Sequence, residues 1–120
     1  MTMRIQTTAR VQVYESWIVA YLCKDFGSYY RSLCPKAWCI KPPMYPPHIT
    51  ILRKDIESFS TREDLPCFAA IEYEPGVKTD GLYYWLDVYS EEIGDIRESL
   101  GLSRYRDGFN CYHVTIGNNK

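Results

Sequence analysis

The two histidines of the chain each open the same four-residue pattern. The pattern reads HITI from His48 and HVTI from His113. In a β-strand, side chains at positions i and i+2 project from one face, and those between them project from the other. Each copy therefore predicts a His and a Thr, Thr50 or Thr115, side by side on one face, with aliphatic residues packed behind them.

Two imidazoles and two hydroxyls on neighbouring strands suit chemistry at a phosphate group. Cleavage of a phosphodiester needs a base, an acid and hydrogen-bond donors for the nonbridging oxygens. Because histidine titrates near neutral pH, one ring can accept a proton while the other donates one, and each Thr can donate a hydrogen bond. The alternative is that these are ordinary strand residues, with Thr present for its strand propensity. Two matched copies that use every His favour the paired site.

The same residues argue against a metal centre and a thiol enzyme. Two His at this spacing provide too few ligands, and neither H-E-x-x-H nor a carboxylate cluster lies beside them, so we expect metal-independent chemistry with no cofactor. The five cysteines form no C-x-x-C pair, which predicts buried, reduced thiols. A catalytic thiol at Cys111, beside His113, is the weaker alternative.

Strands and two helices are expected to position the motifs. Asp25 is expected to cap the first helix, whose face carries Phe26, Tyr29, Tyr30 and Leu33, and Ile93, Ile96 and Leu100 share one face of the second. A helix ending in RSL is followed 15 residues later by His48, and one ending in ESL is followed 13 later by His113. This repeat predicts that each half contributes to a shared core or site. Alternating, β-branched or aromatic segments predict strands at residues 5–13, 17–23, 48–52, 68–74, 82–90 and 112–117.

Composition limits the classes of partner. The chain has 120 residues, with 14 Lys+Arg against 15 Asp+Glu, which fits one domain over residues 1–120. A net charge of -1 argues against binding duplex DNA or a membrane surface by bulk electrostatics. No apolar run is long enough to cross a bilayer, and the first ten residues lack the apolar core of a secretory signal. We therefore expect a soluble, cytoplasmic protein, in the host cytoplasm if it is viral.

The paired motifs resemble those of the two-histidine (2H) phosphoesterase superfamily, which includes RNA ligase-like cyclic phosphodiesterases. The segments YYRSL, YPPHITILR and YHVTIGN look especially like its small phage or viral members. The resemblance implies an α+β, bilobal, pseudo-symmetric fold, with two antiparallel sheets forming a central cleft and helices outside. It also implies that His48 and His113 are the acid/base pair and that Thr50 and Thr115 bind phosphate.

The resemblance further implies a metal-independent phosphodiesterase that hydrolyses cyclic nucleotides. Some small viral members degrade cyclic di- or trinucleotide immune signals such as cGAMP, so evasion of host defence is the expected setting. The first alternative is an enzyme that opens 2',3'-cyclic phosphates at RNA ends. The second is a binding protein that sequesters a cyclic nucleotide without cleaving it.

Four further residues are candidates for substrate binding. Tyr45 and Tyr112 lie beside the motifs, and Trp85 belongs to an aromatic run; their rings could stack on nucleobases, with packing in the core or at its rim as the alternative. Arg53 lies five residues after His48, on the opposite face of an unbroken strand. It reaches a phosphate only if the strand ends or twists first.

Overall fold

The computed structural model describes residues 3–15, 17–53, 64–106 and 108–120. Strands dominate these residues, with two α-helices and one 3-10 turn between them. In chain order the elements are β1 (Ile5–Val13), β2 (Trp17–Tyr21), α1 (Asp25–Ser32), η1 (Lys36–Trp38), β3 (His48–Arg53), β4 (Phe68–Tyr73), β5 (Lys78–Thr79), β6 (Tyr83–Tyr89), α2 (Glu91–Ser99) and β7 (Tyr112–Asn118).

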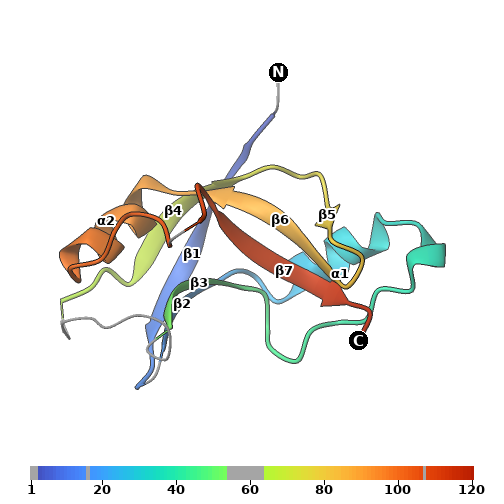
Figure 1. The fold of residues 1–120 in the computed structure, drawn as a ribbon, viewed down its shortest axis with the longest axis horizontal. Helices are drawn as coiled ribbons and strands as arrows, with labels where there is room; N and C mark the ends of the chain where they lie inside the picture. Colours follow the sequence, from blue (N-terminus) through green and yellow to red (C-terminus); the bar gives the residue numbers. More distant parts are fainter. Residues whose placement is uncertain (1–2, 16, 54–63, 107) are drawn as a thin grey trace.

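Six of the strands close into one antiparallel barrel (Figure 1). They pair in the order β4-β1-β2-β3-β7-β6, β6 pairs again with β4, and the short β5 lies on the edge of β6. The expected α+β fold with two sheets around a central cleft is therefore wrong. The reason is that the two halves are joined on both sides, by β1 with β4 and by β3 with β7, so the apolar faces enclose one core.

The core lies inside this barrel and continues onto the helices. Inward residues such as Ile49, Leu86 and Val114 are fully buried. Figure 1 shows α1 and α2 toward opposite ends of the long axis of the molecule. Helix α2 adds the predicted Ile93, Ile96 and Leu100 to the core, and α1 adds Tyr30.

The two helices begin differently. Helix α2 is capped by Ser90, whose Oγ accepts a 3.0 Å hydrogen bond from the Ile93 amide. The predicted cap of α1 is wrong, because Asp25 is its first helical residue and Lys24, at the cap position, makes no side-chain capping bond. Tyr29 of α1 and Leu33, which follows the helix, are exposed, so only part of the expected face is covered.

Among the described residues, neither helix combines the length and the apolar character needed to pass through a membrane.

The element order follows the predicted repeat. One half reads β1-β2-α1-β3, and the other reads β4-β6-α2-β7 with β5 inserted. Where the last strands of the halves meet, Ile49 pairs with Val114, and these residues hold the same place in HITI and HVTI. An approximate two-fold axis therefore passes between the two motifs.

Candidate active site

The two motifs lie on adjacent antiparallel strands, β3 and β7. The Ile49–Val114 pair sets a register that places His48 opposite Thr115 and Thr50 opposite His113. The aliphatic residues of both motifs point into the barrel, and the four polar side chains lie on its outer face. The two histidines are diagonal neighbours, a relation that typically separates residues by about 7–8 Å. The structure thus brings the four predicted catalytic residues together.

A β-bulge at the last residue of the first motif decides where Arg53 points. Val19 pairs with Thr50, whereas Ile18 pairs with Leu52, so Ile51 is the extra residue of β3. Ile51 and Leu52 are both buried, and the alternation is shifted by one position after them. Arg53 therefore returns to the face of Thr50. Arg53 was expected to reach a phosphate only if the strand ended or twisted before it. The bulge is an irregularity of this kind.

A second bulge lies at the same place in the second motif. Tyr84 pairs with Gly117 and Trp85 pairs with Thr115, which leaves Ile116 as the extra residue of β7. Ile116 corresponds to Ile51 in the repeat. The predicted binding residue Trp85 accordingly lies on the outer face beside Thr115, half-buried.

An arginine from each helix reaches the bulge of the other half. Arg97 of α2 donates from Nη1 to the Ile51 carbonyl at 2.8 Å and from Nε to the Ser103 carbonyl at 2.8 Å. Arg31 of α1 donates from Nη1 to the Ile116 carbonyl at 2.7 Å. Arg97 is only 2% exposed, whereas Arg31 is half-buried. These reciprocal bonds satisfy bulge carbonyls and tie each helix to the motif strand of the opposite half.

His48 lies among aromatic rings and is held by the backbone. Its Nδ1 is 2.9 Å from the Pro46 carbonyl oxygen, and because that oxygen only accepts, Nδ1 carries the proton. Nε2 is then the nitrogen left for a substrate. The rings of Trp17, Tyr21 and Tyr45 lie 5.3, 6.2 and 6.4 Å from the imidazole. Tyr45, a predicted binding residue, is 55% exposed, so its ring is available to a ligand.

His113 lies beside charged groups instead. Phe109 stacks on its imidazole at 6.3 Å, and the Arg106 guanidinium lies 4.9 Å from the Phe109 ring centre. Although solvent reaches the side chain, desolvation by the surrounding atoms lowers the pKa of His113, and the positive charge of Arg106 lowers it further. The carboxylate of Asp87, the cross-strand neighbour of His113, acts to raise the pKa of His113. The result favours a neutral imidazole at neutral pH.

Asp87 is itself engaged by two other side chains. Its carboxylate accepts a 3.2 Å hydrogen bond from the Trp85 indole and a bond from the Lys78 ammonium. Nearby, burial raises the pKa of the Cys111 thiol, and Asp87 adds to this. A raised pKa keeps the sulfur protonated, which argues against Cys111 as a nucleophile.

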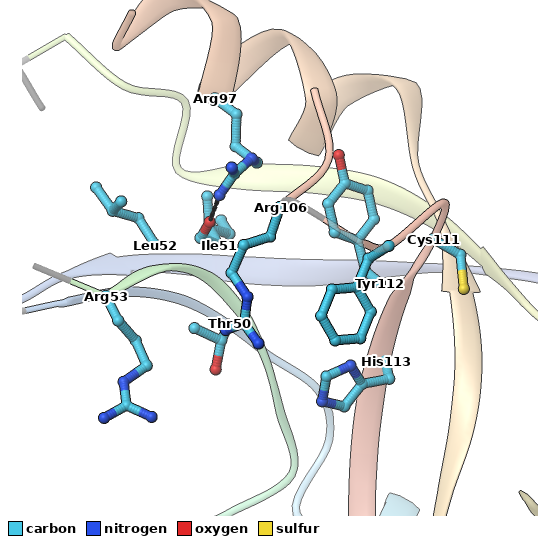
Figure 2. Close-up of a pocket in the computed structure, with 10 residues that line it drawn as sticks. Thr50, Ile51, Leu52, Arg53, Arg97, Arg106, Cys111, Tyr112 and His113 are labelled. Atoms are coloured by element: carbon cyan, nitrogen blue, oxygen red, sulfur yellow. Dashed lines mark hydrogen bonds between the residues drawn. The ribbon is translucent and has the colours of Figure 1, made fainter. Parts of the chain in front are cut away.

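A small pocket opens between the two motif strands, on the His113 side. Figure 2 shows Thr50, Arg53, Arg106 and His113 around it. Tyr112 also borders this pocket, but it is 7% exposed and its hydroxyl donates to the Arg104 carbonyl at 2.5 Å. The Tyr112 ring therefore has little exposed surface on which a nucleobase could stack.

Several contributors to the site carry no clear signal in the sequence. Arg97 and Phe109 belong to an amphipathic helix and to a loop, where charged or aromatic residues are ordinary. One available signal is the alignment of the helix ends, which puts Arg97 within one residue of the position equivalent to Arg31.

The arrangement can accept a proton, donate a proton and hold an anion. Within the part of the chain that the structure describes, no three His, Cys, Asp or Glu side chains come together as metal ligands.

Comparisons with protein-family models, with curated proteins and with solved structures find no match. The function is therefore argued from the site's own geometry.

Proposed function

We propose that the protein is a phosphodiesterase that hydrolyses cyclic nucleotides, with cyclic di- or trinucleotides as the preferred substrates, without using a metal ion. The observation that carries this proposal is the register at Ile49 and Val114, which gathers two His and two Thr on one face. The proposal agrees with the predicted resemblance to the two-histidine phosphoesterases. A role in evading host defence by destroying a cyclic nucleotide signal is the setting that this resemblance suggests.

In the proposed reaction, His113 is the general base and His48 is the general acid. A neutral His113, favoured by its lowered pKa, takes a proton from water, whose oxygen forms a bond to phosphorus. The bond from phosphorus to the leaving oxygen breaks, and protonated His48 gives that oxygen a proton from Nε2. The Pro46 carbonyl, bound to Nδ1, orients the ring and leaves Nε2 for the leaving oxygen.

The other polar groups are assigned to the phosphate. Thr50 and Thr115 donate hydrogen bonds to the nonbridging oxygens, one beside each imidazole. Arg53 and Arg106 supply positive charge at the pocket, where negative charge builds up in the transition state. Donors placed before the reaction starts stabilise that charge without further reorganisation.

A second candidate is an enzyme that opens a 2',3'-cyclic phosphate at an RNA end. The exposure of the site favours it, since His113 and Phe109 are exposed on the outer surface of the barrel. This leaves room for an RNA chain to continue past the site. The same acid/base pair serves this reaction, because it too breaks one phosphorus–oxygen bond of a cyclic diester. Substrate choice, not the imidazole pair, separates the two enzymes.

The test is a turnover panel in EDTA. The purified protein is incubated with cyclic mono-, di- and trinucleotides and with an RNA ending in a 2',3'-cyclic phosphate, and products are identified by mass spectrometry. We expect cleavage of a cyclic di- or trinucleotide by the wild type and by the surface control Lys36→Gln, but not by His48→Ala or His113→Ala. Matched thermal unfolding curves check that the variants are folded.

Each other outcome selects a different account. Cleavage of the RNA end alone supports the second candidate. A ligand that stays bound and unchanged supports the sequestering protein. Undiminished cleavage by the His48→Ala, His113→Ala double variant would overturn the assigned site.

A further inference from the structure

A row of side chains runs sideways from His48 across the outer face of the barrel. Across the neighbouring strands, His48 pairs with Tyr21, Tyr21 with Arg10, and Arg10 with Phe68. Because neighbouring strands lie about 4.8 Å apart, the path from His48 to Phe68 around the curved outer face of the barrel is roughly 14 Å long. The row therefore leads away from the catalytic pair by a distance that a second nucleotide can span.

A groove lies along this row, and we call it the side groove. Its walls include Arg10, Tyr14, Tyr21, Lys24 and Phe68. Phe68 is 61% exposed and Tyr14 is 41% exposed, so both offer ring surface to a ligand.

The side groove is continuous with the catalytic site. Tyr21 belongs to its wall and also lies 6.2 Å from the His48 ring. Pro46 is shared in the same way, because it lines the groove while its carbonyl accepts the hydrogen bond from His48. A substrate bound at His48 thus meets the groove directly.

The charges of the side groove suit an anion. Arg10 lies over the Tyr21 ring, 5.2 Å from its centre, and shares one hydrogen bond with Gln12. Lys24 adds a second cation, and none of the described residues in the groove wall is acidic. Exposed rings between cations are the combination that binds single-stranded nucleic acid, by stacking on bases and pairing with phosphates.

The opposite direction along the barrel does not offer the same surface. Beyond Thr115 the row continues to Trp85 and then to Lys78. The Trp85 indole and the Lys78 ammonium both bond to the Asp87 carboxylate. The charge of Lys78 is therefore already paired with a carboxylate of the protein itself. The substrate is therefore expected to extend from the His48 side.

We propose that the side groove binds the second nucleotide of the substrate, so that the preferred substrate is a di- or oligonucleotide phosphodiester rather than a mononucleotide. This inference rests on the proposed function and specifies its substrate class. The second phosphate pairs with Arg10 and Lys24, and the second base stacks on Phe68 or Tyr14.

The experiment compares two substrates in the same variants. Arg10→Gln with Lys24→Gln removes the cations, Phe68→Ser removes an exposed ring, and Lys36→Gln removes a cation outside the groove as the control. We expect kcat/KM for a cyclic dinucleotide to fall tenfold or more in the groove variants, in line with the roughly 5- to 160-fold effect of losing one base stack. A 2',3'-cyclic mononucleotide, too short to reach the groove, serves as the internal reference.

A binding measurement keeps this inference separate from the proposed reaction. Calorimetry with the cyclic dinucleotide is performed on His48→Ala, alone and combined with the groove substitutions, so that no turnover is needed. If the wild type shows no cleavage and the groove substitutions still weaken binding tenfold, the groove proposal is supported and the phosphodiesterase proposal is refuted. Equal losses for the two substrates, or unchanged dinucleotide binding and turnover, would overturn the groove.

Discussion

The two halves of the site share a backbone design but differ in their surroundings. Each half supplies a His-x-Thr strand, a bulge just after it and a bulge carbonyl held by an arginine from the opposite helix. Around His48 the neighbours are aromatic rings and a backbone carbonyl. Around His113 they include Arg106 and the carboxylate of Asp87.

In the proposed reaction the two similar motifs have opposite roles, and this difference in their surroundings is the basis that we propose for it. An acid and a base require different protonation states, which a symmetric environment would not provide. The cation near His113 disfavours its protonated form, whereas at His48 the Pro46 carbonyl binds Nδ1 and fixes the orientation of the ring. In this proposal the repeat provides the geometry, and the side chains outside the repeat distinguish the acid from the base.

The largest expected effect comes from removing either imidazole. His48→Ala and His113→Ala should each lower kcat by about 100- to 10,000-fold, the usual contribution of a general acid or base. A substrate whose leaving oxygen is replaced by sulfur separates the two roles, because a thiolate leaves without a proton. We expect this substrate to restore most of the activity of His48→Ala and little of that of His113→Ala. The reverse pattern would exchange the two assignments.

The two threonines provide a comparison in which the halves should behave alike. Thr50→Val and Thr115→Val keep the shape of the side chain but remove the hydroxyl. We expect kcat to fall about 100-fold in each variant, as for the loss of one donor to transition-state charge. Thr50→Ser and Thr115→Ser keep the hydroxyl and should retain most activity. A loss in only one half would mean that the phosphate contacts a single strand.

The two arginines test the comparison through stability rather than turnover. Arg97→Met removes the hydrogen bonds from a buried guanidinium to the Ile51 and Ser103 carbonyls and should lower the free energy of unfolding by about 3 kcal/mol. Arg31→Met removes one bond at a half-buried position and should cost about 1.5 kcal/mol. Urea unfolding measures both, with Lys36→Gln as the control. Equal losses would show that burial does not distinguish the two contacts.

Much of the local structure could be predicted from the sequence. Period-two alternation and β-branched runs placed six of the strands, and Ile93, Ile96 and Leu100 marked the buried face of α2 correctly. The paired motifs also predicted a His and a Thr from each half on one surface. These features depend on neighbours in the chain, which is why the sequence carries them.

The closure of the barrel could not be predicted in the same way. A strand buried on one face reads alike in an open sheet and in a barrel, and closure depends on long-range pairs such as Thr8 with Ala70 and Tyr73 with Val88. The bulges at Ile51 and Ile116 interrupt motifs that look regular in the sequence. For this reason the face of the strand on which Arg53 lies could not be predicted from the sequence.

The smallest expected effect concerns the pH dependence of the base. His113 must be neutral to accept a proton, and its pKa lies below the ordinary 6.5, so the acidic limb of kcat/KM should lie below pH 6.5. Arg106→Gln removes a neighbouring positive charge, which raises the pKa of His113 and moves this limb to higher pH. Arg53→Gln changes a cation of the same pocket that is not among the named causes of this shift, so it should move the limb less than Arg106→Gln. If the limb stays fixed in Arg106→Gln, the group that titrates is not His113, and the difference between the two halves has another origin.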